Sequence, residues 1–341
     1  MKIALDAMGG DYAPTTNIDG AIEALDLNKE LSIVLVGDEA KISSELKQRN
    51  CKGLSIEVKH ASQVVEMEDS PLTAIRRKKD SSIRVAIDLV KAGKADAMIS
   101  AGNSGVVMAT ALLVLGKLPG IERPAIAAIM PSFKDHFVLI DAGANVDCKP
   151  LNLYQFGIMG DAYARCIFDI DSPKVGLLSI GEEDAKGNEL TKEALKLLKD
   201  AKVNFIGNIE GKDIFEGEAD VVVCDGFVGN ITLKVSEGLA ETLSKMLKKE
   251  MMEKASGKID PSLLKEAFKN FKLRTDYSEY GGAPLLGISK PCIISHGRSS
   301  SNAIKNAIKV AGTFQSKSVL DVISREINQG LTGRDTIAIE K

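Results

Sequence analysis

The sequence predicts an α/β protein whose mostly parallel sheet is covered by helices on both faces. Short runs of apolar, often β-branched residues alternate with longer amphipathic segments along almost the whole chain. These runs are apolar throughout, which is typical of strands buried on both faces of a parallel sheet. The alternation therefore favours a layered α/β architecture over an all-helical or all-β one.

Nine apolar runs have the length and composition of strands. They are KIALD (2–6), LSIVLV (31–36), DAMIS (96–100), AIAAIM (125–130), FVLID (137–141), KVGLLSI (174–180), VNFIG (203–207), ADVVVCD (219–225) and PCIIS (291–295). Helical spacing of apolar residues predicts helices that include 81–93, 103–115, 150–168, 189–201, 229–253 and 299–325. The sequence contains no repeat and no Pro/Gly/Ser-rich linker, so we expect one composite α/β domain over residues 1–341.

The segment 241–275 departs from this alternation. It has no strand pattern, and it carries nine Lys or Arg against five Asp or Glu. Pro261 fits the first turn of a helix, and apolar residues then recur at helical spacing. They are Leu263, Leu264, Ala267, Phe268 and Phe271. We expect a helical hairpin that protrudes from the body.

Composition excludes several classes of function. The formal net charge is −3, and the chain has no Trp and only five Tyr, which argues against a nucleic-acid partner. The five cysteines never form a C-x-x-C pair, which fits a reducing cytoplasm. The longest apolar stretch, 106–116, is about half of the ~20 residues that span a bilayer. We expect a cytoplasmic protein whose membrane contact, if it has one, is peripheral.

Glycine-rich or polar turns follow six of the predicted strands. They are AMGGD (7–11), AGNSG (101–105), AGANVDCKP (142–150), GEEDAKGNEL (181–190), GFVGN (226–230) and HGRSSSN (296–302). Ligands of parallel sheets bind outside the carboxyl ends of the strands, and helix starts offer N–H groups to anions. The alternative is that these Gly and Asn residues only cap helices. Six such turns together favour an anion pocket.

Absent motifs narrow the ligand. The chain has no G-x-x-x-x-G-K-[ST] phosphate loop, no G-x-G of a dinucleotide site and no G-x-S-x-G elbow. His60, His136 and His296 show no metal-ligand spacing. We therefore expect no metal and no cofactor, and a small anion held mainly by neutral donors.

The same segments carry a family resemblance. DAMGGD (6–11), IRRKKDSS (75–82), SAGNSG (100–105), RPA (123–125), DAGANVDCKP (141–150), EDAKGNEL (183–190), DGFVGN (225–230), YGGAPLLG (280–287) and HGRSSSNA (296–303) occur in order. Together they resemble the PlsX-type phosphate acyltransferases from about residue 1 to residue 325.

This resemblance implies a three-layer α/β/α fold similar to phosphotransacetylases and isocitrate-type dehydrogenases, and a homodimer. It implies transfer of a long-chain fatty acyl group from acyl-acyl-carrier-protein to inorganic phosphate. A membrane acyltransferase would then pass the acyl phosphate to glycerol 3-phosphate in phospholipid (phosphatidic acid) synthesis. Three alternatives stay open: a short-chain acyl-CoA phosphotransacetylase, a non-catalytic membrane or scaffold module, and a nicotinamide dehydrogenase.

Site residues are assigned on the matching motifs. We expect Gly102, Asn103, Ser104 and Gly105 to hold phosphate. Charge and oxyanion stabilisation are assigned to Lys186, Asn188 and Asn230, with Asp184 orienting Lys186. His296 either protonates the leaving thiolate or is a structural hydrogen-bonding residue.

Two basic features have competing interpretations. Arg76, Arg77, Lys78 and Lys79 form either a docking patch for an acidic acyl carrier protein or a solvated helix face. The stripe that includes Leu264, Phe268 and Phe271 packs in a dimer interface or core, covers the acyl chain, or contacts anionic lipid.

Overall fold

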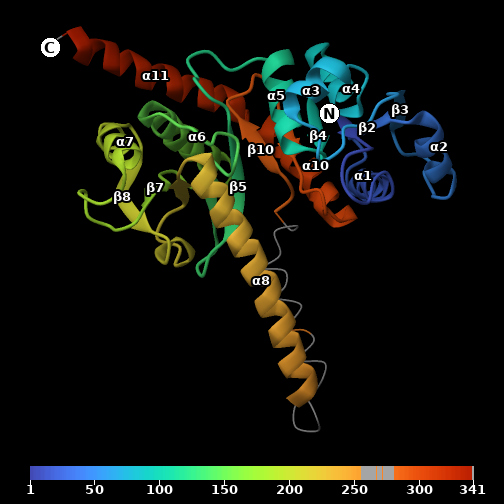
Figure 1. The fold of residues 1–341 in the computed structure, drawn as a ribbon. Coiled ribbons are helices and arrows are strands. Elements are labelled where there is room, and N and C mark those ends of the chain that lie inside the picture. The colour runs from blue at the N-terminus through green and yellow to red at the C-terminus, as the bar shows by residue number, and fades with distance from the viewer. Residues whose placement is uncertain (255–265, 267–270, 272–279, 340–341) are drawn as a thin grey trace.

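The computed structural model describes residues 1–254, 266, 271 and 280–339 (Figure 1). Within these described residues, eleven strands form one sheet in the order β3-β2-β1-β4-β11-β10-β5-β6-β9-β7-β8. The strands are β1 (Lys2–Asp6), β2 (Ser32–Gly37), β3 (Ile56–His60), β4 (Ala97–Ser100), β5 (Ala125–Pro131), β6 (His136–Ile140), β7 (Lys174–Ser179), β8 (Asn204–Glu210), β9 (Val221–Val223), β10 (Ala283–Leu286) and β11 (Cys292–Ile294).

The sheet consists of two parallel halves that run in opposite directions. Three consecutive antiparallel pairings, β11–β10, β10–β5 and β5–β6, separate the halves at the centre of the sheet. Ile294, at the end of β11, lies opposite Ala283. Ile140, at the end of β6, lies opposite Ala127, one step along β5 from the pairing of Ile126 with Leu285. The carboxyl ends of the two halves therefore approach each other across the short strand β10.

Helices cover both faces of this sheet. They are α1 (Thr15–Leu27), α2 (Glu39–Lys47), α3 (Pro71–Arg77), α4 (Ser82–Lys91), α5 (Ser104–Val114), α6 (Pro150–Phe168), α7 (Glu189–Lys199), α8 (Gly226–Lys254), α10 (Ser301–Ser316) and α11 (Val319–Ile339), with a 3₁₀ turn at Asp213–Phe215. None of the described helices combines the length and apolarity needed to cross a bilayer.

The side chains of β1 show how the layers are built. Successive residues of a strand point to opposite faces of the sheet. Ile3 and Leu5 belong to the apolar core that contains Ile18 of α1, whereas Ala4 belongs to a second core that contains Ile83 of α4. The predicted mostly parallel sheet with helices on both faces is confirmed.

Some boundaries differ from the prediction. Every predicted strand is present, and the structure adds β3 and β10. The single helix expected over 299–325 is two helices, because Ser318 adopts a left-handed φ of 50° between α10 and α11.

The predicted protrusion is only partly described. Helix α8 extends away from the body through Lys254 (Figure 1). Most of the second half of the expected hairpin, including Leu264 and Phe268, lies outside the described residues. The expectation of one composite domain over 1–341 stays a prediction.

Candidate active site

The turn after β1 supports the neighbouring glycine-rich turns. Asp6 is fully buried, and its carboxylate accepts hydrogen bonds from the Met8 N–H at 3.1 Å and the Ser100 hydroxyl at 2.6 Å. Burial raises the pKa of Asp6, which the hydrogen bond from Ser100 opposes. A Cβ on Gly9 would lie 2.6 Å from the backbone N of Gly102, so this close packing requires glycine. The turn after β1 therefore packs directly against the turn after β4.

The turn after β4 opens helix α5. Asn103 caps this helix by accepting a hydrogen bond from the Val106 N–H at 3.1 Å. Its amide nitrogen donates to the carbonyls of Met67 at 2.8 Å and Asp69 at 3.0 Å. The Asn103 side chain thus anchors the 66–70 loop in this structure, and its contact with phosphate stays a prediction.

The other hydrogen-bond donors of the turn after β4 are either already bonded within the chain or available to a ligand. The Gly102 N–H already donates to the Ser100 hydroxyl at 3.0 Å. Ser104 and Gly105 lie in the first turn of α5, where backbone N–H groups have no acceptor within the helix. Ser104 is exposed. The backbone of Ser104 and Gly105, with the Ser104 hydroxyl, is the part of the predicted phosphate site that can contact a ligand.

Asp141 organises the loop after β6. Its buried carboxylate accepts hydrogen bonds from the backbone N–H groups of Ile126 and Ala144, each at 3.0 Å, and of Asn145 at 2.7 Å. Burial raises the pKa of this carboxyl, and these N–H donors oppose the rise. The carboxylate therefore fixes the loop in which Gly143, with a φ of 136°, faces Asn230.

The start of α8 packs tightly on that loop. Asp225 accepts hydrogen bonds from the N–H groups of Phe227 at 2.9 Å and Val228 at 3.0 Å. A Cβ on Gly229 would lie 1.9 Å from the Asp141 carbonyl oxygen. Glycine at position 229 thus allows the first turn of α8 to approach the loop, and the helix then presents Asn230 beside Gly143.

The turn after β11 carries His296. The ring Nδ1 accepts a hydrogen bond from the Arg298 N–H at 3.1 Å, so the neutral imidazole holds its proton on Nε2. Burial lowers the pKa of His296, and the charge of Lys234 lowers it further. Ser295 and Ser299 share a hydrogen bond of 2.7 Å between their hydroxyls. This turn leads into α10, which Ser300 caps.

The start of α5, the loop after β6, the beginning of α8 and the turn after β11 line one cavity of about 290 Å³ at the centre of the sheet. Its polar residues come from the first turn of α5, residues 230–237 of α8, the loop after β6 and the turn before α10. They include Ser104, Gly143, Asn230, Lys234, Glu237, Ser295, His296 and Ser299. An apolar wall completes it, formed by Ile126, Ala128, Ile129, Ala142, Leu233, Ala283, Ile294 and Ala303. The cavity therefore combines anion donors with apolar surface.

Sequence reasoning missed Lys234 and Glu237. Both line the cavity, and their side chains form an ion pair of 2.8 Å. Lys234 lies one helical turn beyond Asn230, and Glu237 lies nearly another turn beyond Lys234. Residues four positions apart share a helix face. Helical spacing from the predicted Asn230 is thus the signal that identifies both.

The loop after β7 lies outside the cavity lining. Asp184 pairs with Lys199 of α7 in this structure, and its expected role in orienting Lys186 stays a prediction. Asn188 caps α7 by accepting a hydrogen bond from the Thr191 N–H at 2.9 Å. Lys186 is exposed. The structure therefore gives the cavity a nearer ammonium group in Lys234, and the catalytic roles of Lys186 and Asn188 stay predictions.

The basic run ends helix α3. The Lys78 ammonium donates to the Val64 carbonyl at 2.7 Å and pairs with Asp69 at 2.5 Å, so it holds the same loop as Asn103. The part of Lys78 in a docking patch stays a prediction, since its ammonium group is engaged within the chain. Arg76, Arg77 and Lys79 are exposed.

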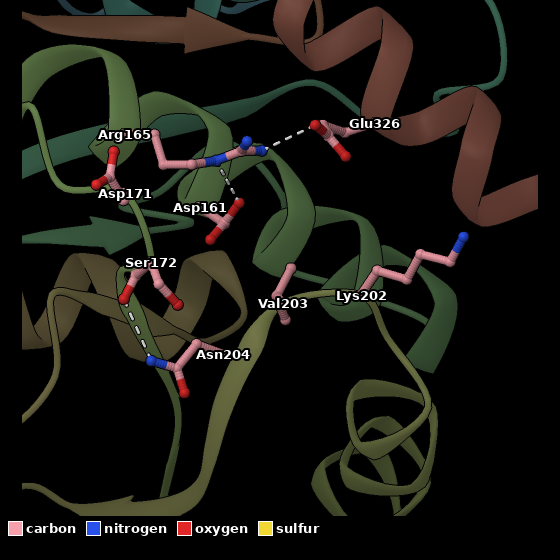
Figure 2. Close-up of a pocket in the computed structure, with 8 residues that line it drawn as sticks. All are labelled: Asp161, Arg165, Asp171, Ser172, Lys202, Val203, Asn204 and Glu326. Atoms are coloured by element: carbon pink, nitrogen blue, oxygen red, sulfur yellow. Dashed lines mark hydrogen bonds and ion pairs between the residues drawn. The ribbon is translucent and has the colours of Figure 1, made fainter.

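A second cavity, of about 480 Å³, lies at the amino ends of β7 and β8, beside α6 and α11 (Figure 2). Figure 2 shows Arg165 between two carboxylates, Asp161 at 2.9 Å and Glu326 at 3.0 Å. Burial raises the pKa of Asp161 to about 6, against the effect of Arg165. The other lining residues are Asp171, Ser172, Lys202, Val203 and Asn204. Carboxylates outnumber cations here, so this cavity is a poor anion site.

Among the residues that the structure describes, no cluster of three or more His, Cys, Asp or Glu side chains is placed to hold a metal ion.

Comparison with known proteins identifies the family. The family model described as "Fatty acid synthesis protein" matches residues 1–322. The "Phosphate acyltransferase" of Thermodesulfovibrio yellowstonii is 59% identical over 330 residues, which are 96% of this chain and 95% of that protein. The chain belongs to the phosphate acyltransferase family. A second member, from Geotalea daltonii, is 54% identical over 319 residues, or 94% of this chain and 92% of that protein. The predicted resemblance is confirmed, and the chain is an acyltransferase of this lipid-synthesis family.

Solved structures agree on the fold. A phosphotransacetylase from Streptococcus pyogenes matches with a TM-score of 0.60 and 19% identity, over 94% of each chain. A branched-chain phosphotransacylase from Enterococcus faecalis V583 matches with a TM-score of 0.56 and 14% identity, over 92% of this chain and 98% of that one. At these identities the likeness shows the fold alone. It confirms the expected similarity to phosphotransacetylases.

Proposed function

We propose that the protein transfers a long-chain fatty acyl group from an acyl-acyl-carrier-protein thioester to inorganic phosphate. The central cavity is the observation that carries this proposal. Its helix starts and Lys234 suit an anion, and its apolar wall suits an acyl chain. The name that the relatives share supports phosphate as the acceptor.

The reaction needs little acid or base strength. A phosphate oxygen attacks the thioester carbonyl, the C–S bond breaks, and the thiolate receives the proton that phosphate loses. Phosphate is already an anion and a thiolate leaves readily, so positioning and oxyanion stabilisation are the main tasks. The first-turn N–H groups of Ser104 and Gly105 hold phosphate in this proposal.

Two cavity residues are assigned to the oxyanion. Asn230 supplies an amide N–H from the start of α8. The lowered pKa of His296 favours the neutral ring, which donates a hydrogen bond, over the imidazolium that would protonate the thiolate. We therefore assign His296 to hydrogen bonding at the carbonyl instead of acid catalysis.

Lys186 and Asn188 keep their predicted roles as proposals. Their loop follows β7, which runs parallel to β9 beside β6, so it lies at the same edge as the loop after β6. Lys186→Ala should lower kcat by on the order of 10²-fold if the loop acts in the transition state. A near-normal kcat removes Lys186 from the mechanism.

The acyl carrier protein is proposed to dock on α3. Arg76, Arg77 and Lys79 present exposed positive charge on or beside this helix. A Cβ on Gly105 would lie 3.1 Å from the Pro71 ring, so α3 begins directly against the predicted phosphate turn. Charge complementarity would steer an acidic carrier to this edge of the cavity.

A second copy of the chain is the proposed partner of α8. Apolar side chains recur along one face of this helix and are exposed: Val228, Ile231, Val235, Leu239, Leu243, Met246 and Leu247. At 100° per residue this face is opposite the one that carries Asn230, Lys234 and Glu237. A two-fold homodimer would cover the stripe without closing the cavity.

The product links the protein to a membrane. An acyl phosphate is a labile amphiphile, so we keep the proposal of a cytoplasmic enzyme in peripheral contact with the membrane. It would supply a membrane glycerol-3-phosphate acyltransferase in phosphatidic acid synthesis. Vesicle flotation of Phe268→Glu/Phe271→Glu against the unmodified protein tests the contact, and equal flotation with an intact dimer would refute it.

Mass spectrometry of the reaction products tests the proposed function. Purified protein, palmitoyl carrier protein and phosphate should give palmitoyl phosphate, with palmitoyl-CoA and acetyl-CoA compared as donors. Acyl phosphate from acetyl-CoA alone would identify a short-chain phosphotransacetylase instead. Absence of phosphate-dependent thioester cleavage with every donor would refute the enzymatic proposal. Direct attack also requires that no acylated Ser or Cys forms with donor alone.

A further inference from the structure

The cavity pairs a cation with a carboxylate, which a simple anion site does not need. Lys234 and Glu237 both line it, and their ion pair measures 2.8 Å. The Glu237 side chain is 18% exposed, against 47% for Lys234, so the carboxylate is the more enclosed of the two. Both charges also act on His296 across the cavity: Lys234 lowers the pKa of the ring and Glu237 raises it. The pair therefore faces the reacting space.

A carboxylate in this position discriminates between anions. It repels a fully deprotonated anion such as sulfate, because both carry negative charge and neither carries a proton to share. Hydrogen phosphate has the same shape but retains one O–H group, which donates a hydrogen bond to a carboxylate. A site with an ammonium group and an adjacent carboxylate thus fits hydrogen phosphate better than sulfate.

The reaction also has a proton to move. When a hydrogen phosphate oxygen forms the new C–O bond, the remaining O–H becomes more acidic, because the acyl group withdraws electrons from the phosphate. The C–S bond breaks with its electron pair on sulfur, and that thiolate needs one proton. One proton thus leaves phosphate and one arrives at sulfur, so a carboxylate beside both can carry it without an external acid.

We propose that Lys234 binds the phosphate nucleophile and that Glu237 accepts the phosphate proton and returns it to the departing sulfur. This inference rests on the proposed acyl transfer to phosphate. Besides proton transfer, Glu237 has a second role in this proposal: it selects hydrogen phosphate over anions that lack an O–H group.

Steady-state kinetics and calorimetry on the full chain test the two roles. Glu237→Gln should lower kcat by on the order of 10²-fold, and Glu237→Asp should recover part of that loss. Lys234→Met should raise KM for phosphate about 10-fold or more and weaken phosphate binding measured by calorimetry. Sulfate should inhibit Glu237→Gln more strongly than the unmodified protein, because the repulsion is gone and the amide can donate.

The same helix supplies the matched control. Glu241 and Lys245 form an ion pair of 2.7 Å further along α8 and are absent from the cavity lining. Glu241→Gln and Lys245→Met should leave kcat, KM for phosphate and sulfate inhibition unchanged. Circular dichroism and thermal melting verify that each variant is folded.

The outcomes separate this inference from the function on which it rests. If the unmodified protein forms no acyl phosphate, the proposed function fails. If it forms acyl phosphate while Glu237→Gln keeps kcat and sulfate inhibition within about 3-fold, the proton-transfer role is overturned. Unchanged phosphate binding by Lys234→Met would overturn the binding role.

Discussion

The Ser100 hydroxyl bridges two turns of the site. It donates a hydrogen bond of 2.6 Å to the buried Asp6 carboxylate and accepts one of 3.0 Å from the Gly102 N–H. The end of β1 and the end of β4 are thereby tied together directly under the first turn of α5. The geometry of the predicted phosphate turn depends on this buried pair as well as on its own glycines.

Ser100→Ala should therefore destabilise the protein by about 1–3 kcal/mol, because the buried Asp6 carboxylate and the Gly102 N–H each lose a partner. Urea unfolding at neutral pH measures the change. Ser55→Ala is the control, since the Ser55 hydroxyl bonds Ser32 at an exposed position and its loss should cost less than about 0.5 kcal/mol. Equal stability of the two variants would contradict the supporting role.

The long apolar strands could be predicted because their burial on both faces leaves a continuous run of apolar letters. Strand β3 was missed because IEVKH mixes exposed charges with half-buried residues, as an edge strand does. Strand β10 was missed because it is four residues long and contains Pro284. The opposed direction of the two halves follows from three antiparallel pairings, which no local pattern encodes.

Part of the site could be predicted because polar residues that follow an apolar strand are visible as a local sequence pattern. Ser104, Asn230 and His296 follow strand ends and do meet in the cavity. Asn103 and Asn188 also follow strand ends, so the sequence does not distinguish them from the cavity residues. In the structure each of these two side chains caps a helix. Lys234 was missed because it lies two turns inside α8, where Lys usually signals a solvated face.

Gly229 offers a second prediction because its packing can be compared with another glycine on the same helix. A Cβ at position 229 would lie 1.9 Å from the Asp141 carbonyl oxygen, which is backbone and must move. Gly229→Ala should lower Tm by several degrees, and it should reduce acyl transfer because it displaces Asn230. A Cβ at Gly238 meets nothing within 4 Å. Gly238→Ala should raise stability by about 0.5–1 kcal/mol through helix propensity. Matching melting curves for the two variants would contradict this account.

Asp161 gives a pH-dependent prediction. Burial raises its pKa from 3.8 in the unfolded chain to about 6 in the folded one. The folded state therefore binds the proton more tightly, and stability from this group is lost as pH rises from about 4 through 6. In urea unfolding, the stability of the unmodified protein relative to Asp161→Asn should be higher at pH 4.5 than at pH 7. A constant difference across that range would show that Asp161 ionises normally.

The exposed stripe of α8 provides the last prediction. Val235 is 63% exposed and Leu239 is 56% exposed, one turn apart on the same face. If a second copy covers this face, Val235→Glu and Leu239→Glu place a charge in an apolar contact and should shift sedimentation velocity from dimer to monomer. Lys248→Glu, on the opposite face of the helix, changes charge without entering the stripe and should remain dimeric. The stripe is not the interface if all three variants sediment as the unmodified protein does. Because the cavity lies on the other side of α8, the monomeric variants should still bind phosphate, which calorimetry can measure.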